Sequence, residues 1–388
     1  MLKENKFHFL IYLAFLSIIG FLAIDMYLPA FEIMRNNLNT SKVFISSSLS
    51  LYLGGIGIAQ LFWGPVSDKF GNPKTILMGL TIFSLSSIGI YLTHNIAVFL
   101  VLRVFQAFGV CAATVCWQAL VIERFPSSET SKIFASIMPL VALSPAFAPL
   151  LGVVILQQFG WRYIFIVLAL IAFLLILYTL SLKNYRKIIP KTKGNLSYSS
   201  FFKFKDYIGN VLIYAFCSAS FFAWLTGAPF FLKEMGYDES AIGWSFVPQT
   251  IAFIVGGYSL RLFPDTVKTK KLLPLLLIGY SIFILLLLFI ILFTSPTLTT
   301  LLIPFCCMAL CNGACYPIVV NNALKHFSEN AGKASALQNT IQLGCCFLAS
   351  SLVSVFSKNA LLTTGIVMAS TIFFVVIGYR MSVLYRRN

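Results

Sequence analysis

Long apolar runs follow one another along the whole chain, with short polar intervals between most of them. A run of about 20 apolar residues is long enough to cross the hydrocarbon core of a bilayer as a helix. Hydrophobic residues make up 59% of the 388 residues and charged residues only 10%, whereas a soluble domain is about half apolar and about a quarter charged. Since backbone groups inside a bilayer must be satisfied internally, the spans are expected to be helical. The sequence therefore predicts an all-α polytopic membrane protein.

The runs predict twelve transmembrane helices in two bundles of six. The first six cover residues 7–36, 42–66, 74–92, 96–121, 132–157 and 161–182, and the second six cover 207–232, 239–262, 272–294, 297–322, 333–357 and 360–381. Between the bundles lies one long polar interval that carries seven Lys and Arg residues. We expect an N-terminal six-helix bundle over 1–182, a basic linker over 183–206 and a C-terminal six-helix bundle over 207–388.

The basic residues are unevenly distributed between the two ends of the predicted spans. If the N-terminus is cytoplasmic, 22 of the 28 Lys and Arg residues fall at the inner side. Cytoplasmic loops of membrane proteins carry such an excess. The pattern places both termini and the linker in the cytoplasm, and it explains the net charge of +16 without nucleic-acid binding.

An acid, Asp25, lies inside the first apolar run. An ionised carboxylate at the centre of a membrane helix costs at least about 2.5 kcal/mol. Pro29 lacks the N–H that would bond the carbonyl of Asp25, which leaves a second acceptor beside the first. Both groups should line a wet, protein-enclosed cavity. We expect Asp25 to take up and release a proton; the alternative is a kinked helix in which Asp25 merely pairs with a neighbour.

Arg103 is the base that lies well inside a predicted span. It is about seven residues below the outer end of its span and Asp25 about eleven below its own, so at ~1.5 Å per residue their depths differ by about 6 Å. We expect Arg103 to hold Asp25 charged in one state, until movement or the arrival of substrate lets Asp25 protonate. The alternative is a static ion pair that fixes helix position.

Two further stretches carry closely spaced prolines and glycines. Residues 64–74 read Gly-Pro-Val-Ser-Asp-Lys-Phe-Gly-Asn-Pro-Lys and permit a tight turn between antiparallel helices. In residues 144–152, two prolines free backbone carbonyls and a final glycine lets a neighbouring backbone approach. Glu123 is a further candidate for a gate that includes Asp68 in the first stretch. The alternative is that Glu123 is simply solvated. We expect gating or conformational roles for Pro29, Gly64, Asp68, Gly71, Pro145, Pro149 and Gly152.

The spans of the second half carry neutral polar and aromatic residues where acids and bases are absent. Amides inside a span need hydrogen-bond partners, and a cavity supplies them. Such residues suit a flat, neutral, heteroaromatic solute that stacks on rings and bonds to amides, although any single ring can instead serve packing. The candidate substrate-binding residues of the two halves are Tyr27, Gln106, Trp117, Tyr214, Phe221, Trp224, Gln249, Asn312, Tyr316, Gln338 and Gln342.

Cysteine and histidine residues give no sign of a metal site. The nine cysteines fall inside apolar segments, where they act as small hydrophobic residues, and the three histidines are far apart in the sequence. An enzyme embedded in the membrane would need acid–base or metal residues grouped together. We therefore expect no catalytic residues, no metal and no cofactor, with a proton gradient as the energy source. A passive channel or a membrane-embedded enzyme fits less well.

Four of these stretches, in this order, resemble the major facilitator superfamily, its drug–proton antiporter group and the Bcr/CflA family within it. They are Asp-Met-Tyr-Leu-Pro at 25–29, the loop at 64–74, Arg-x-x-Gln at 103–106 and Pro-x-x-x-Pro-x-x-Gly at 145–152. Residues 217–227, 247–253, 312–320 and 336–344 resemble the branch of that family with purine nucleoside transporters. The sequence departs from the family at Lys69 and Asn72, where arginine is usual, and at Ala107, where glycine is usual.

The resemblance implies a proton-coupled secondary active transporter that works by alternating access, with its substrate site near the midplane between the bundles. It implies efflux of a small neutral or aromatic drug by proton antiport in a bacterial inner membrane; the alternative is uptake of purine nucleosides. The partners would be the solute, protons and the lipid bilayer, with no nucleic acid, and we expect a monomer.

Overall fold

The computed structural model describes residues 6–125, 127–182, 198–260, 271–325, 327 and 331–384, and all of its regular elements there are helices. The chain divides into two compact units, Met1–Ile189 and Pro190–Asn388, called unit 1 and unit 2 below. The division falls within the predicted linker. Residues 183–197 of that linker lie outside the described residues, and its last part forms the short helix α8 and the start of α9.

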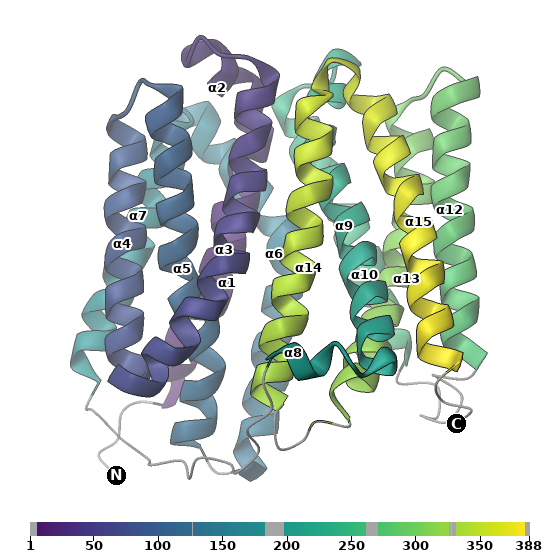
Figure 1. Ribbon diagram of the computed structural model, residues 1–388. Coiled ribbons are helices and arrows are strands. Elements are labelled where there is room, and N and C mark those ends of the chain that lie inside the picture. The colour runs from purple at the N-terminus through teal and green to yellow at the C-terminus, as the bar shows by residue number, and fades with distance from the viewer. Residues whose placement is uncertain are drawn as a thin grey trace. The chain divides into compact units, whose positions relative to one another are not determined.

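Unit 1 is a bundle of long helices (Figure 1, purple to blue). Its helix α4 packs against α5 and α7, α3 packs against α5, and α1 packs mainly against α6. The elements are α1 (Lys6–Asp25), η1 (Leu28–Ala30), α2 (Phe31–Asn37), α3 (Lys42–Phe70), α4 (Asn72–Leu92), α5 (Ile96–Arg124), α6 (Ser127–Phe159) and α7 (Arg162–Ser181).

Unit 2 repeats the architecture of long packed helices (Figure 1, teal to yellow). Its helix α9 packs against α14 and α15, and α13 packs against α10 and α12. The elements are α8 (Tyr198–Phe201), α9 (Lys205–Glu234), α10 (Glu239–Ser259), α12 (Leu273–Phe293), α13 (Leu298–Leu324), α14 (Ala331–Val355), η5 (Ser357–Asn359) and α15 (Ala360–Leu384).

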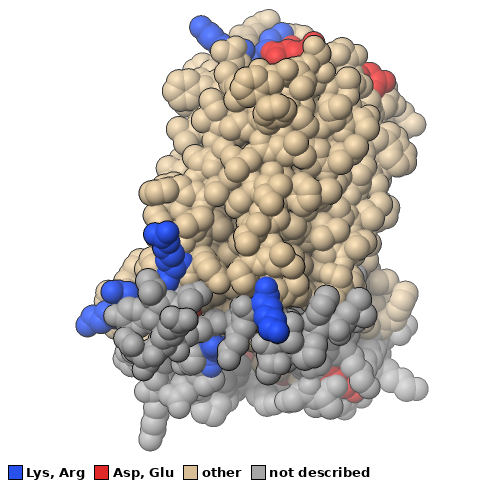
Figure 2. Space-filling view, turned by 90° about the vertical axis from the view of Figure 1, so that its right-hand side faces the viewer, with Lys and Arg blue, Asp and Glu red and all other residues tan. Residues whose placement is uncertain are grey.

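The predicted membrane architecture is confirmed. Among the described residues, eleven helices are long and apolar enough to span a bilayer, and a shorter apolar stretch, Leu143–Phe159, belongs to the long helix α6. The helix ends fall within about five residues of the predicted span ends. Figure 2 shows one face of the molecule, on which charged side chains gather toward the two ends and leave a broad uncharged band between them.

The first span differs from the prediction of one continuous run. Helix α1 ends at Asp25, residues 26–27 form a turn, and the chain continues through η1 into α2. Pro29 lies inside η1, where the N–H of Ala30 bonds the carbonyl of Tyr27 at 3.0 Å. Because proline cannot donate to the preceding turn, the chain adopts tighter three-residue turns here. The break places the Asp25 side chain at the end of a helix rather than in its middle.

Helix α6 lies directly against this break. A side-chain carbon added to Gly152 would come within 1.8 Å of the carbonyl oxygen of Met26, so only a glycine permits the observed approach of the two backbones. Helix α6 itself continues through Pro145 and Pro149 without interruption. The prolines of this stretch therefore leave α6 unbroken, whereas the glycine allows the close approach of α6 to the end of α1.

The expected turn at residues 64–74 is shorter than the sequence predicts. Helix α3 continues past Gly64 to Phe70, and α4 begins at Asn72. The whole connection is Gly71, with a φ of 85° that favours glycine. The side chain of Asp68 lies outside the described part of the structure.

Candidate functional site

Asp25 is almost completely buried, with 2% of its surface exposed, at the point where α1 ends. Its carboxyl group makes no hydrogen bond or ion pair with any residue that the structure describes. Burial without a donor or a cation makes an ionised carboxylate expensive. The position thus suits a group that changes its charge, and it does not suit a permanent ion.

Arg103, on α5, is fully buried in a cage of tyrosine rings. Its guanidinium carbon lies 4.4 Å from the ring centre of Tyr27 and 4.2 Å from that of Tyr52, which belongs to α3. Such contacts attract a cation to the faces of aromatic rings. The Tyr27 hydroxyl in turn bonds Ser48 at 3.0 Å. Tyr27, a predicted substrate residue, here contacts the arginine instead.

Hydrogen bonds link Arg103 to two other helices of unit 1. Its Nη1 donates to the carbonyl of Ala23 at 3.2 Å and to Oε1 of Gln106 at 2.5 Å. The Gln106 Nε2 then donates to the hydroxyl of Ser87, on α4, at 2.7 Å. Both ends of the Gln106 amide are therefore used inside unit 1, where they position the arginine.

The two predicted proton-coupling residues lie in the same region of unit 1 but do not form an ion pair with each other. Arg103 reaches the backbone of α1 two residues before Asp25. Its Nε and Nη2 atoms are buried and have no hydrogen-bond partner. A guanidinium with unused donors can bind a carboxylate in another arrangement of the same helices.

In unit 2, Ser218 joins three helices through one hydroxyl. This side chain, on α9, bonds the Tyr316 hydroxyl of α13 at 2.9 Å and accepts from Nε2 of Gln342, on α14, at 3.1 Å. The Tyr316 ring also packs edge-on against Tyr214, with 4.9 Å between ring centres. The structure therefore brings three of the predicted substrate residues together around Ser218.

Four other predicted residues of unit 2 are buried and keep polar atoms without a partner. Each is at most 2% exposed. Both amide atoms of Gln249 are unpaired, as are the Trp224 Nε1, the Asn312 Oδ1 and the Gln338 Oε1. The amide nitrogen of Asn312 is used, since it donates to the carbonyl of Cys217 at 3.2 Å. Buried groups of this kind normally have partners, so these atoms are available to a solute or to water.

Unit 2 also contains an aromatic stack. The Trp224 ring stacks on Phe305, from α13, with 4.2 Å between centres and 17° between planes. Phe221, one turn earlier on α9, also stacks on Phe305 at 6.0 Å. Sequence reasoning missed Phe305, although its spacing of seven residues from Asn312 places it on the same side of α13.

Two further predicted residues, Trp117 and Glu123, both belong to α5. Trp117 is buried in α5, with 4% of its surface exposed. At the end of unit 1 where α4 begins, Asn72 donates to Oε2 of Glu123 at 3.0 Å and ties α4 to α5. The bond between Asn72 and Glu123 was not predicted.

The chain matches the sequence pattern of the Major Facilitator Superfamily over residues 13–350. A protein of Bacillus subtilis (strain 168) described as an uncharacterized MFS-type transporter, YdgK, is 32% identical over 357 residues, which cover 90% of this chain and 89% of that protein. A bicyclomycin resistance protein homolog of Haemophilus influenzae is 26% identical over 282 residues, 71% of each chain. The family match includes the stretches with Asp25 and Arg103.

The fold agrees with the sequence comparisons. The crystal structure of a D-xylose-proton symporter superposes with a TM-score of 0.78 at 15% identity and covers 97% of each chain. At that identity the likeness concerns the fold alone. The match over most of the sequence shows that the chain belongs to the Major Facilitator Superfamily and is a membrane transporter of small solutes, not an enzyme.

Proposed function

We propose that this transporter exports a small neutral solute in exchange for protons and that Asp25 carries the proton. The observation that carries the proposal is the Asp25 carboxyl group, buried at the break in α1 without any partner among the described residues. Such a group binds a proton without breaking an existing contact, and it can lose the proton when a cation comes near. The likeness to a bicyclomycin resistance protein homolog supports export.

Arg103 is the cation available to Asp25. It already touches α1 through Ala23, and two of its nitrogen atoms have no partner. A small rearrangement of α1 against α5 would bring these donors to the carboxylate and favour release of its proton. One charge that moves down 100 mV supplies about 2.3 kcal/mol, which can drive a solute up about a fiftyfold gradient.

The solute would bind to neutral groups of unit 2. All charged side chains described there lie near helix ends, whereas the buried Trp224, Gln249 and Asn312 offer unpaired donors and acceptors. A charged solute would meet no counter-ion at these groups. A neutral molecule with both donors and acceptors, and with a flat part that can stack near Phe305, would fit them.

A second candidate function, uptake of a purine nucleoside, rests on the same stack. Unit 2 contains both the nearly parallel Trp224 and Phe305 rings and buried amides with unpaired atoms, and a nucleobase combines a flat face with a hydrogen-bonding edge. The direction of transport separates the two candidates.

The orientation and setting complete the proposal. Both termini would lie in the cytoplasm, because the excess of Lys and Arg falls at the ends of the helices on that side. The membrane would be the inner membrane of a bacterium, and no cofactor besides the proton gradient would be needed.

Transport by the purified chain in vesicles tests the proposal. Vesicles with an imposed pH gradient would be loaded in turn with labelled bicyclomycin, labelled adenosine and a neutral dye. Export by proton antiport predicts that bicyclomycin or the dye accumulates by moving opposite to the flow of protons. Asp25→Asn would abolish this accumulation. Glu32→Gln is the matched control, because Glu32 is a partly exposed acid of the same unit that pairs with Arg35.

Accumulation of adenosine in the direction of proton flow would instead select the nucleoside candidate. Transport by Asp25→Asn with unchanged dependence on the pH gradient would contradict the assigned role of Asp25 in either case.

A further inference from the structure

A pocket of about 400 Å³ opens at one end of unit 1, where α4 ends and α7 begins. It lies at the opposite end of the unit from the start of α1, among short connections that the transport site does not use. Its walls carry one arginine, one histidine and several aromatic rings, and no acid. The lining residues are Asn37, Tyr91, Leu92, His94, Phe159, Gly160, Trp161, Arg162 and Tyr163.

Arg162 is held in place but not neutralised. Its guanidinium stacks over the Trp161 ring at 4.4 Å, and its Nη2 donates to the carbonyl of Thr93 at 3.3 Å. Its Nε atom is buried and has no hydrogen-bond partner. The stack fixes the plane of the guanidinium, so the charge of Arg162 is held in a constant position.

The location of this charge at a helix start adds to the case. Arg162 is the first residue of α7, which has no acid in its first turn and no side chain that caps its N-terminus. The start of a helix favours an anion and disfavours a cation. An oxyanion in the pocket would neutralise Arg162 and lie at a helix start, where a negative charge is favoured.

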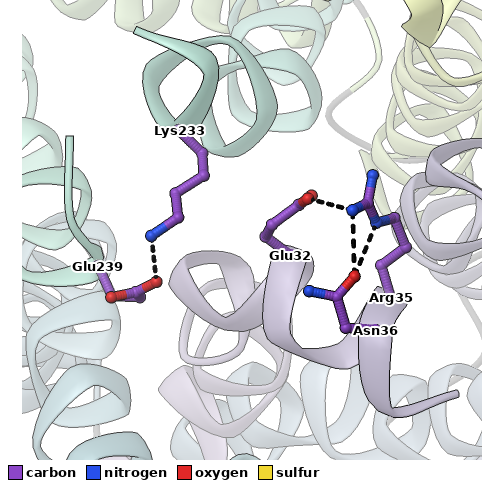
Figure 3. Close-up of polar contacts among 5 residues, drawn as sticks. All are labelled: Glu32, Arg35, Asn36, Lys233 and Glu239. Atoms are coloured by element: carbon purple, nitrogen blue, oxygen red, sulfur yellow. Dashed lines mark hydrogen bonds and ion pairs between the residues drawn. The ribbon is translucent and has the colours of Figure 1, made fainter. Parts of the chain in front are cut away.

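The protein's own groups near the pocket are engaged elsewhere. On α2, the acid Glu32 pairs with Arg35 at 2.6 Å, and Arg35 also donates to Asn36 (Figure 3). The Oδ1 of Asn37 accepts from the Trp161 Nε1 at 3.3 Å. Neither group is therefore offered to Arg162.

We propose that this pocket binds a phosphate-type oxyanion, supplied by the headgroup of an anionic phospholipid at that membrane surface. The pocket lies where helices leave the bilayer, which is the level of lipid headgroups and of interfacial Trp and Tyr side chains. Phe159 and Tyr163, 62% and 42% exposed, would contact the glycerol and upper acyl region.

Lipid binding to the full-length protein in detergent tests the assignment. Delipidated protein would be titrated with phosphatidylglycerol and with phosphatidylcholine, and bound lipid counted by native mass spectrometry. We expect the wild type to prefer phosphatidylglycerol and Arg162→Gln to bind it about tenfold more weakly, because a charge-assisted bond is lost. Arg35→Gln, which alters a basic residue already paired with Glu32, should bind like the wild type.

Arg162→Lys guards against a variant that fails to fold, since it keeps the charge but loses the planar stack; it should bind with intermediate affinity. Inorganic phosphate separates the two sources of the oxyanion. If it displaces phosphatidylglycerol, the site takes free phosphate as well; if the lipid remains bound, the acyl region contributes. Equal binding of the two lipids, or equal binding by the wild type and Arg162→Gln, would overturn the proposal.

Discussion

Arg103 is the residue at which four helices of unit 1 meet. Its guanidinium bonds the backbone of α1, its faces contact Tyr27 and Tyr52, and its bond to Gln106 continues to α4. A planar guanidinium makes contacts through its edge and its faces simultaneously, and an ammonium group cannot. The arginine therefore organises the surroundings of Asp25 even though it does not pair with it.

Arg103→Lys should consequently behave as a disruptive substitution. We expect the free energy of unfolding to fall by about 2 kcal/mol, since both ring contacts and the bond to Gln106 weaken, and transport to be lost. Thermal unfolding and vesicle transport would measure the two effects. Arg35→Lys provides the control, because Arg35 is partly exposed; equal stability losses in both variants would argue against the cage.

Gln249 offers a test in which stability and function change in opposite directions. Both of its amide atoms are buried and unpaired, which costs about 1–3 kcal/mol. Gln249→Leu should therefore raise the melting temperature and weaken substrate binding. Gln342→Leu is the comparison, because that amide donates to Ser218 and its loss should destabilise the protein. A Gln249→Leu protein that is less stable than the wild type would contradict an unpaired amide.

At the scale of elements, the contact between α6 and the end of α1 depends on the absence of a side chain at Gly152. Gly152→Ala places a carbon where the carbonyl oxygen of Met26 lies, so α6 must move away. We expect a destabilisation on the order of 1–3 kcal/mol and a loss of transport, measured by thermal unfolding and vesicle uptake. Gly344→Ala, at a helical glycine with open space around it, should be as stable as the wild type or slightly more stable.

Sequence reasoning recovers the helices of this protein because each is encoded locally. The apolar runs give twelve spans with nearly correct ends, and Pro29 marks the neighbourhood where α1 breaks. The break itself was not predicted, because a proline can also kink a continuous helix. The close approach at Gly152 follows from glycine in a span, but its partner, Met26, depends on how α6 is rotated about its axis.

The surroundings of the candidate site are harder to predict from the sequence, because they depend on contacts between helices. Asp25 and Arg103 stand out by their charge inside apolar segments. Tyr52 and Phe305 do not stand out, because the chain has 38 Phe and 16 Tyr residues and only packing decides which ring meets a guanidinium or an indole. Side chains that contact each other across helices leave no periodic signal in a single sequence.

The orientation of the whole molecule is a prediction that a reporter fusion can check. Alkaline phosphatase is active only outside the cytoplasm, so a fusion after residue 388 should be inactive and one within residues 93–95, between α4 and α5, should be active. Fluorescent protein fusions at the same positions should give the reverse pattern. An active phosphatase at the C-terminus would invert the assigned topology, and with it the direction of transport.

The central claim is that binding of the solute and binding of a proton to Asp25 oppose each other. The most direct test is to measure the protons released when the solute binds. Purified protein in weakly buffered detergent, mixed with solute at a pH where the carboxyl is protonated, should release about one proton per bound solute; by linkage, solute affinity then rises with pH. Asp25→Asn should release none and bind with an affinity independent of pH. Proton release by Asp25→Asn equal to that of the wild type would contradict the account.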